Sequence, residues 1–198
     1  MKHFFLIVLI GIISNSYSQN DFSDIYNNDS IIKKGVNLYD LEKFDQAIIE
    51  YNKITPNDPK YLSAQYEKAL CLNALNKKDE LKLFLENLYL TKQMQKSPEL
   101  YTLYGVFLSD NKEYELSEKI FNEGKKYLSN SASFLYNFAI LYIRKQENQK
   151  CIDLLKQVIT INPNYSSSHY LLGLIAFENG KITEGTLALM SYLILTPN

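Results

Sequence analysis

Histidine is the side chain in this sequence best suited to general acid–base catalysis, because its ordinary pKa lies close to neutral pH. The chain has two histidines, His3 and His169. His3 lies in an apolar N-terminal segment, and His169 belongs to no HExxH, GxSxG or paired histidine–carboxylate pattern. We therefore interpret His169 as a packing residue, with a hydrolase that uses His169 beside an acid as an alternative.

A second candidate for chemistry is the run Gly180-Lys181-Ile182-Thr183, which is similar to the end of a phosphate-binding loop. Ile175, however, stands where the first glycine of such a loop belongs. We interpret the run as a turn between two helices. Two histidines and two cysteines also leave too few ligands for a metal site, so we predict no catalytic residue, no cofactor and no metal.

The composition is that of a folded chain with little net charge. Of the 198 residues, 46% are hydrophobic and 22% are charged, which is enough to bury a core. Lysine and arginine number 21, aspartate and glutamate 22, and the net charge is −1. Such a chain has no overall field to attract nucleic acid, and we predict no nucleic-acid partner.

The N-terminus has the pattern of a secretory signal. Lys2 precedes an apolar run at residues 4–13, and Ser16 and Ser18 then supply small residues at alternate positions. The run is half the length of about 20 residues that a membrane span needs. We predict a signal peptide over residues 1–18, a periplasmic or secreted mature chain, and no later membrane span. The alternative is an uncleaved anchor.

Small residues recur through the chain at a nearly constant spacing. The first column, with steps of 34, 36, 34 and 34 residues, consists of Gly35, Ala69, Gly105, Ala139 and Gly173. Twelve residues further on stand Ala47, Leu81, Ser117, Cys151 and Gly185, and four residues after those stand Tyr51, Leu85, Phe121, Leu155 and Leu189. Three columns in phase over five units indicate an internal repeat.

Each repeat has the pattern of two helices joined by a short turn. Phe134, Phe138 and Leu141 recur at helical spacing, residues 146–149 interrupt the apolar pattern, and a second stripe follows. Small residues allow the two helices to approach closely where they cross. One such hairpin cannot bury its apolar faces alone, so neighbouring hairpins must stack. We predict an all-α fold, an α-solenoid of about five helix-turn-helix units.

These columns resemble the tetratricopeptide repeat family. The resemblance is best over residues 105–124, with Gly105, Ser117 and Phe121, and over residues 139–163, which close on Pro163. The composition, rich in Asn, Lys, Ile and Tyr and without Trp, resembles that of secreted proteins of the Bacteroidota.

The resemblance implies five units, at residues 28–61, 62–97, 98–131, 132–165 and 166–198, after a linker at residues 19–27. The second repeat, residues 62–97, departs from the pattern, because it has Leu81 at a small-residue position, two extra residues and no closing proline. Cys71 and Cys151 fall two units apart, too far for the Cα separation of about 7 Å that a disulfide requires. We interpret both as buried free thiols.

In this family the first helices line a concave groove that binds partners. Carrying the groove positions over gives Tyr66, Leu70, Tyr136, Ile140, Ile143, Tyr170, Leu174 and Phe177. Aromatic side chains in a groove are good anchors for a partner. For Ile140 and Leu174, packing between units is an equal alternative.

The last unit has apolar residues in its second helix with no following unit to cover them, namely Leu187, Met190, Tyr192 and Ile194. Solenoids normally carry a polar terminal cap, so we predict an interface at this C-terminal end, formed by further repeats, self-association or another protein. Taken together, we predict a non-enzymatic scaffold at the cell envelope that binds a protein or peptide in its groove. A glycan-binding envelope protein is the alternative.

Overall fold

The computed structural model describes residues 17–196, which fold into α-helices and one short 3₁₀ helix. The predicted all-α architecture of paired helices is confirmed. Nearly all of the predicted signal peptide, residues 1–18, lies outside the described residues. Within residues 17–196, no helix combines the length and apolar character needed to cross a membrane.

The chain divides into two compact units, Met1–Cys71 and Leu72–Asn198. The first contains α1 (Tyr17–Asp40), α2 (Phe44–Tyr51) and most of α3 (Tyr61–Ala74). Its core includes Ala47, Tyr51 and Cys71. Residues 19–27, predicted as a linker, belong to α1 instead, because no glycine or proline between residues 12 and 34 interrupts that helix.

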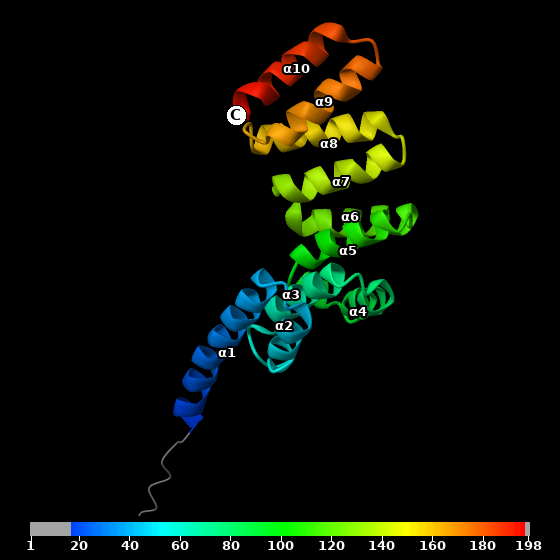
Figure 1. Ribbon diagram of the computed structural model, residues 1–198. Coiled ribbons are helices and arrows are strands. Elements are labelled where there is room, and N and C mark those ends of the chain that lie inside the picture. Colours follow the sequence, from blue (N-terminus) through cyan, green and yellow to red (C-terminus); the bar gives the residue numbers. More distant parts are fainter. Residues whose placement is uncertain (1–16, 197–198) are drawn as a thin grey trace, which may run out of the picture. The chain divides into compact units, whose positions relative to one another are not determined.

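The second unit is built from successive helical hairpins. Its elements are α4 (Lys78–Leu90), the 3₁₀ helix η1 (Gln93–Gln95), α5 (Glu99–Asp110), α6 (Tyr114–Leu128), α7 (Ala132–Arg144), α8 (Asn148–Ile161), α9 (Ser166–Glu178) and α10 (Ile182–Leu195). Within this unit α5–α6, α7–α8 and α9–α10 pack as pairs, and α6 and α8 each contact the first helix of the next pair. Figure 1 shows these pairs stacked in chain order.

The small-residue columns mark the points where paired helices touch. A Cβ placed on Gly105 of α5 would lie 2.7 Å from the ring of Phe121 on α6, and one on Gly173 of α9 would lie 2.7 Å from Leu189 on α10. Real Cβ atoms do not approach other atoms so closely. The large residue of the third column therefore occupies the space that the glycine leaves, as the sequence columns predict.

The same residues carry the packing from one pair to the next. The ring of Phe121 stacks on Phe138 of α7 at a centroid distance of 5.0 Å and meets Phe134 edge-on at 5.6 Å. Ser117, fully buried in the second column, donates its hydroxyl to the Gly105 carbonyl at 2.7 Å. One aromatic ring thus contacts two successive hairpins.

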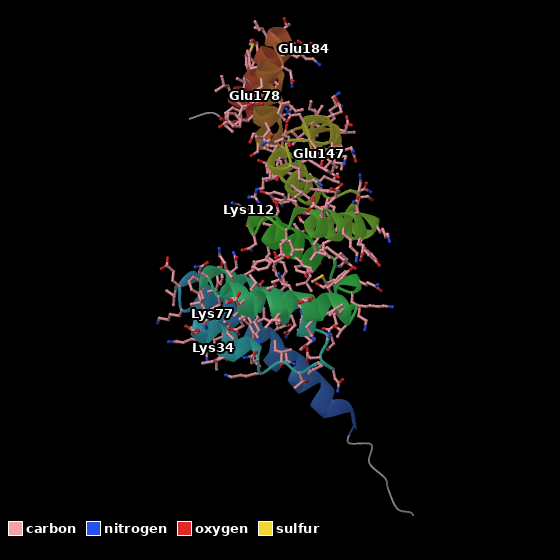
Figure 2. All side chains as sticks on the ribbon, turned by 90° about the vertical axis from the view of Figure 1, so that its right-hand side faces the viewer. Lys34, Lys77, Lys112, Glu147, Glu178 and Glu184 are labelled. Carbon is pink, nitrogen blue, oxygen red and sulfur yellow. The ribbon has the colours of Figure 1, made fainter. Side chains whose placement is uncertain are left out.

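The turns inside the hairpins repeat a feature that the columns do not show. In each of these turns the second-to-last residue has a left-handed backbone, with φ between 53° and 71°. These residues are Glu42, Asn76, Lys112, Gln146 and Gly180. The next residue donates its backbone N–H to the carbonyl five residues earlier, for example Glu147 to Tyr142 at 2.8 Å. This is the bond of a Schellman cap, which ends a helix. Figure 2 looks onto the edge of the second unit where Lys112 and Glu147 mark successive turns.

The departures predicted for the second sequence repeat have a structural counterpart. Leu81 is only 1% exposed although it replaces a small residue. Between α4 and α5, this longer repeat contains η1, which follows Lys92 in a left-handed conformation and buries Met94 completely. This segment therefore adds an apolar side chain to the core rather than a surface loop.

We expect Gly105→Val to lower the free energy of unfolding by about 2–3 kcal/mol, because the added branches must displace the Phe121 ring from a filled core. Urea denaturation of the variant and the unmodified chain measures the difference. Shortening the obstructing side chain in Gly105→Val,Phe121→Leu should make the valine substitution less costly than it is beside Phe121. An equal loss in both backgrounds would show that this contact is not the cause.

Candidate binding surface

The second unit places six of the predicted groove residues at equivalent positions of two successive first helices. We call this set the first-helix face: Tyr136, Ile140 and Ile143 of α7, and Tyr170, Leu174 and Phe177 of α9. The three α9 side chains are exposed, at 42%, 37% and 39%, and the three α7 side chains are half-buried. The structure therefore leaves part of each of these side chains accessible to a partner.

Tyrosine pairs lie near the N-terminal ends of these helices. The Tyr136 ring lies 5.1 Å from that of Tyr165, which immediately precedes α9, and the Tyr170 ring lies 5.2 Å from that of Tyr192 on α10. Such tilted ring pairs are mutually stabilising. Tyr165 was not among the predicted residues, because it precedes the helix and occupies no groove position of the repeat.

Phe177 has a second role besides its exposure. A Cβ on Gly185 of α10 would lie 2.9 Å from the Phe177 ring, so this ring fills the space over that glycine. Phe177, predicted as a groove residue, thus also packs in the contact between α9 and α10. Leu174, for which packing was the equal alternative, is more than one-third exposed.

Arg144 ends the first-helix face at the last turn of α7. Its guanidinium donates to the Ser109 hydroxyl at 2.8 Å and forms an ion pair with Asp110, both at the end of α5. The contact joins the first helices of two successive hairpins. Because Asp110 neutralises Arg144, this contact adds little net charge beside the face.

The remaining predicted residues lie elsewhere. Tyr66 and Leu70 are half-buried on α3, and their membership of a common groove stays a prediction. At the predicted C-terminal interface, Leu187, Met190 and Ile194 are exposed on α10, whereas Tyr192 is half-buried beside Tyr170. Ile182 and Leu193 are also exposed there and were not predicted.

The histidine considered for catalysis and the two cysteines take part in the packing and hydrogen bonding of the fold. His169 Nε2 lies 2.8 Å from the Pro163 carbonyl oxygen, and since a carbonyl only accepts, Nε2 carries the proton. Cys71 and Cys151 are fully buried and free, and burial raises the pKa of each thiol to about 11. Both thiols are therefore neutral at physiological pH and poor nucleophiles. Over the described part of the chain, no three His, Cys, Asp or Glu side chains gather as a metal site.

A pocket of about 390 Å³ opens among α8, α9 and α10. Ile152, Leu172, Ala176 and Ala188 give it an apolar lining, and Lys156, Lys181 and Glu184 stand among its polar residues. Sequence patterns did not indicate this pocket. Its lining comes from three helices of two repeats, and none of these residues stands out in the sequence as a candidate for binding.

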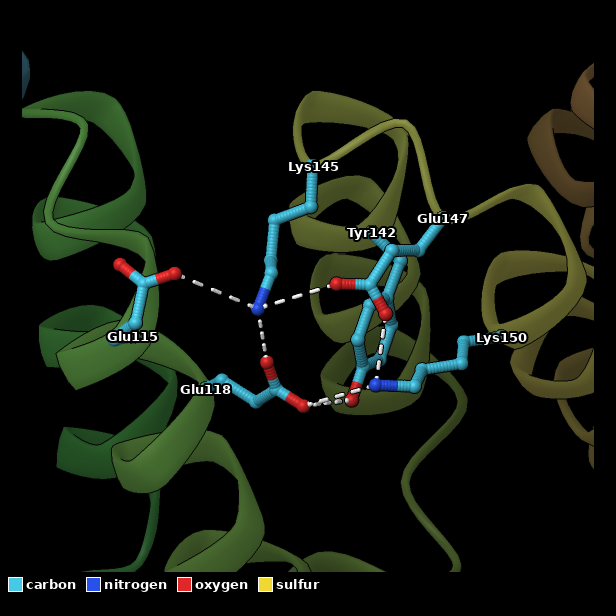
Figure 3. Close-up of polar contacts among 6 residues, drawn as sticks. All are labelled: Glu115, Glu118, Tyr142, Lys145, Glu147 and Lys150. Atoms are coloured by element: carbon cyan, nitrogen blue, oxygen red, sulfur yellow. Dashed lines mark hydrogen bonds and ion pairs between the residues drawn. The ribbon is translucent and has the colours of Figure 1, made fainter.

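A polar network joins α6, α7 and α8 on the turn side of the second unit (Figure 3). At its centre is Glu118, which accepts from the Tyr142 hydroxyl at 2.8 Å and pairs with Lys145. Lys150 lies 3.4 Å from Glu118 and 2.7 Å from Glu147, and its Nζ lies 4.9 Å from the centre of the Tyr142 ring. The network fastens one hairpin to the next.

The network changes the titration of its members. Burial opposes the ionisation of Glu118, but the hydrogen bonds from Lys145 and Tyr142 outweigh it and hold the pKa of this carboxyl below its ordinary 4.5. Burial, and then the hydrogen bond to Glu118, raises the pKa of the Tyr142 phenol. Glu118 is therefore an anion, and Tyr142 a neutral donor, at neutral pH.

The hairpin of α7 and α8 matches a known sequence family. Residues 132–165 match the family described as tetratricopeptide repeat. The α7–α8 hairpin is therefore similar in sequence to a tetratricopeptide repeat. No curated protein matches the chain.

Solved structures extend the likeness of fold beyond this one hairpin. A crystal structure of MamA is 18% identical, with a TM-score of 0.69, and the match covers 81% of this chain and 93% of that one. TTC0263, a tetratricopeptide repeat protein of Thermus thermophilus, is 17% identical, with a TM-score of 0.66 over 86% and 92% of the two chains. YrrB, described as a tetratricopeptide repeat protein with an unusual peptide-binding site, is 14% identical, with a TM-score of 0.62 over 89% and 92%. At these identities the likeness shows the fold alone.

We expect Glu118→Gln to lower the free energy of unfolding by about 1–2 kcal/mol at neutral pH, because it removes the anion that bonds the α7–α8 hairpin to α6. Since the folded-state pKa is lowered, the stabilisation is present above the ordinary pKa and disappears as the pH falls through the folded-state value. Urea denaturation at neutral and acid pH should show the gap between variant and unmodified chain closing in acid.

Glu115→Gln is the matched control for this prediction. The Glu115 side chain is 87% exposed and lies 3.8 Å from Lys145, so its loss should cost no more than about 0.5 kcal/mol. If the two substitutions were equally costly, or if the gap at Glu118 widened in acid, the role assigned to Glu118 would be wrong.

Proposed function

We propose that the chain is a non-enzymatic binding scaffold whose first-helix face takes a segment of a protein or peptide partner. The observation that carries this proposal is the repetition of partly exposed aromatic and aliphatic side chains at equivalent positions of α7 and α9. A single exposed ring is common on any protein surface, but here the exposure recurs at the same positions of successive first helices. Tyr136 and Tyr170 present rigid, amphipathic surface, which is the usual material of binding hot spots.

The chemistry of the face favours an apolar partner segment over a charged one. Arg144 is already paired with Asp110, and the six residues that define the face are uncharged. Affinity should therefore come from burial of apolar surface, with little electrostatic steering. Tetratricopeptide repeats serve as protein-interaction modules, and the peptide-binding site described for YrrB is consistent with this use of a similar fold.

We further propose that the mature chain works in the periplasm or outside the cell. Support comes from the charged start, the apolar run at residues 4–13 and the small residues Ser16 and Ser18. Compartments outside the cytoplasm are oxidising, and a buried, neutral thiol reacts slowly with oxidants, so both cysteines can stay free there.

Peptides selected from a displayed random library against the purified chain provide a probe for the first-helix face. We expect Tyr136→Ala and Tyr170→Ala each to weaken the selected peptides at least about tenfold, equivalent to about 1.4 kcal/mol, in fluorescence anisotropy titrations. Raising the salt concentration should change the affinity of the unmodified chain only slightly, because little charge lies on the face.

Tyr127→Ala supplies the control for this titration. Tyr127 is 47% exposed, close to the 42% of Tyr170, but lies on the second helix α6 with its ring against Tyr101. The proposal fails if Tyr127→Ala weakens binding as much as Tyr170→Ala does, or if binding collapses on modest addition of salt.

The location is tested separately by expressing the chain in a Gram-negative cell of the Bacteroidota and fractionating it. We expect a mature form that begins at Gln19 by N-terminal sequencing and that is recovered outside the cytoplasm. Ser16→Leu,Ser18→Leu should block this processing, because both small residues that the peptidase needs are lost. A chain recovered intact in the cytoplasm would contradict the proposed location without bearing on the binding surface.

A further inference from the structure

The helix α10 presents an apolar stripe to solvent. Leu187, Met190 and Ile194 are exposed at 61%, 54% and 75%. Their spacing of three and four residues places them on one side of the helix. That side is opposite Gly185 and Leu189, which contact α9. We call these three residues the α10 stripe.

The stripe differs from the same positions on α6 and α8, and from α4, where Glu86 stands between Leu83 and Leu90. The equivalent residues are Lys119, Asn122 and Lys126 on α6, and Asp153, Lys156 and Thr160 on α8. All six are at least partly exposed, although a further hairpin packs against α6 and another against α8. Stacking of a repeat therefore does not cover these positions, and the α10 stripe is not simply a surface that awaits the next repeat.

Two features of α10 favour a second copy of the same helix as the occupant. From Gly185 to Thr196 the chain has no charged residue, so two α10 helices can face each other without bringing like charges together. Spacing at i, i+3 and i+7 is that of the apolar seam between two paired helices. An antiparallel pair related by a two-fold axis would use the same stripe on both copies.

The size of the contact fits a modest interface. The 14 residues of α10 form a helix about 21 Å long. Two such helices in contact bury at most on the order of 1,000 Å² in total, which is in the range of weak or transient associations. We propose that the chain forms a two-fold symmetric dimer through the α10 stripe, and that the dimer forms and dissociates with protein concentration.

Sedimentation equilibrium of the full chain, in the form in which the cell processes it, tests the proposal. We expect a reversible monomer–dimer equilibrium, and we expect Leu187→Glu,Ile194→Glu to raise the dissociation constant at least ~tenfold. Both side chains are more than 60% exposed, so the helical circular dichroism should be unchanged. Met190→Cys should form a disulfide-linked dimer on mild oxidation, because Cys71 and Cys151 are buried and do not compete.

The matched control uses the equivalent positions of α4. Leu83 and Leu90 are each 69% exposed, but Glu86 lies between them on that helix. Leu83→Glu,Leu90→Glu should leave the dimer intact. A strict monomer at high concentration, a dimer broken equally by the α4 variant, or a ladder of higher oligomers that survives the α10 substitutions would each overturn the proposal. None of these results depends on peptide binding at the first-helix face.

Discussion

The structure depends on the close approach of two helices at one crossing point in each hairpin. At Gly105 and Gly173 the partner side chain lies where a Cβ would otherwise stand. The glycine alone would leave a cavity, and the large residue alone would hold the helices apart. The small residue and the large residue are therefore needed together at each crossing point. Phe121 also contacts the next hairpin, because its ring stacks on Phe138.

A second constraint acts on the turns. Each turn needs one left-handed residue, which is disfavoured for any residue with a Cβ, yet Gly180 is the only glycine at that position among the described turns. At Lys112 and Gln146 the following N–H bonds to a carbonyl five residues earlier, which offsets part of this cost by capping the helix. Tight turns keep the helices of a pair antiparallel, so the crossing point and the turn determine the hairpin together.

The predictability of each feature follows from how strictly the structure restricts its residue type. Crossing points exclude bulk, so Gly105 and Gly173 were visible in the sequence, and with them the number of hairpins. The left-handed position accepts Glu, Asn, Lys or Gln, so no column revealed it. The groove residues came from resemblance to a family, and resemblance could not show that Phe177 also packs over Gly185. The linker expected at residues 19–27 is helical because nothing there interrupts a helix.

The same reasoning explains where this chain has freedom to acquire binding surfaces. Inward positions are restricted by the crossing points, and the network around Glu118 occupies the turn side of α6–α8. Outward positions of the second helices carry no such restriction, and the same position is Leu83 on α4, Lys119 on α6, Asp153 on α8 and Leu187 on α10. An apolar residue at such a position stays exposed to solvent, so its burial does not contribute to the stability of its own chain. The α9–α10 hairpin exposes both the α10 stripe and half of the first-helix face, so the two proposed contact surfaces meet on this hairpin.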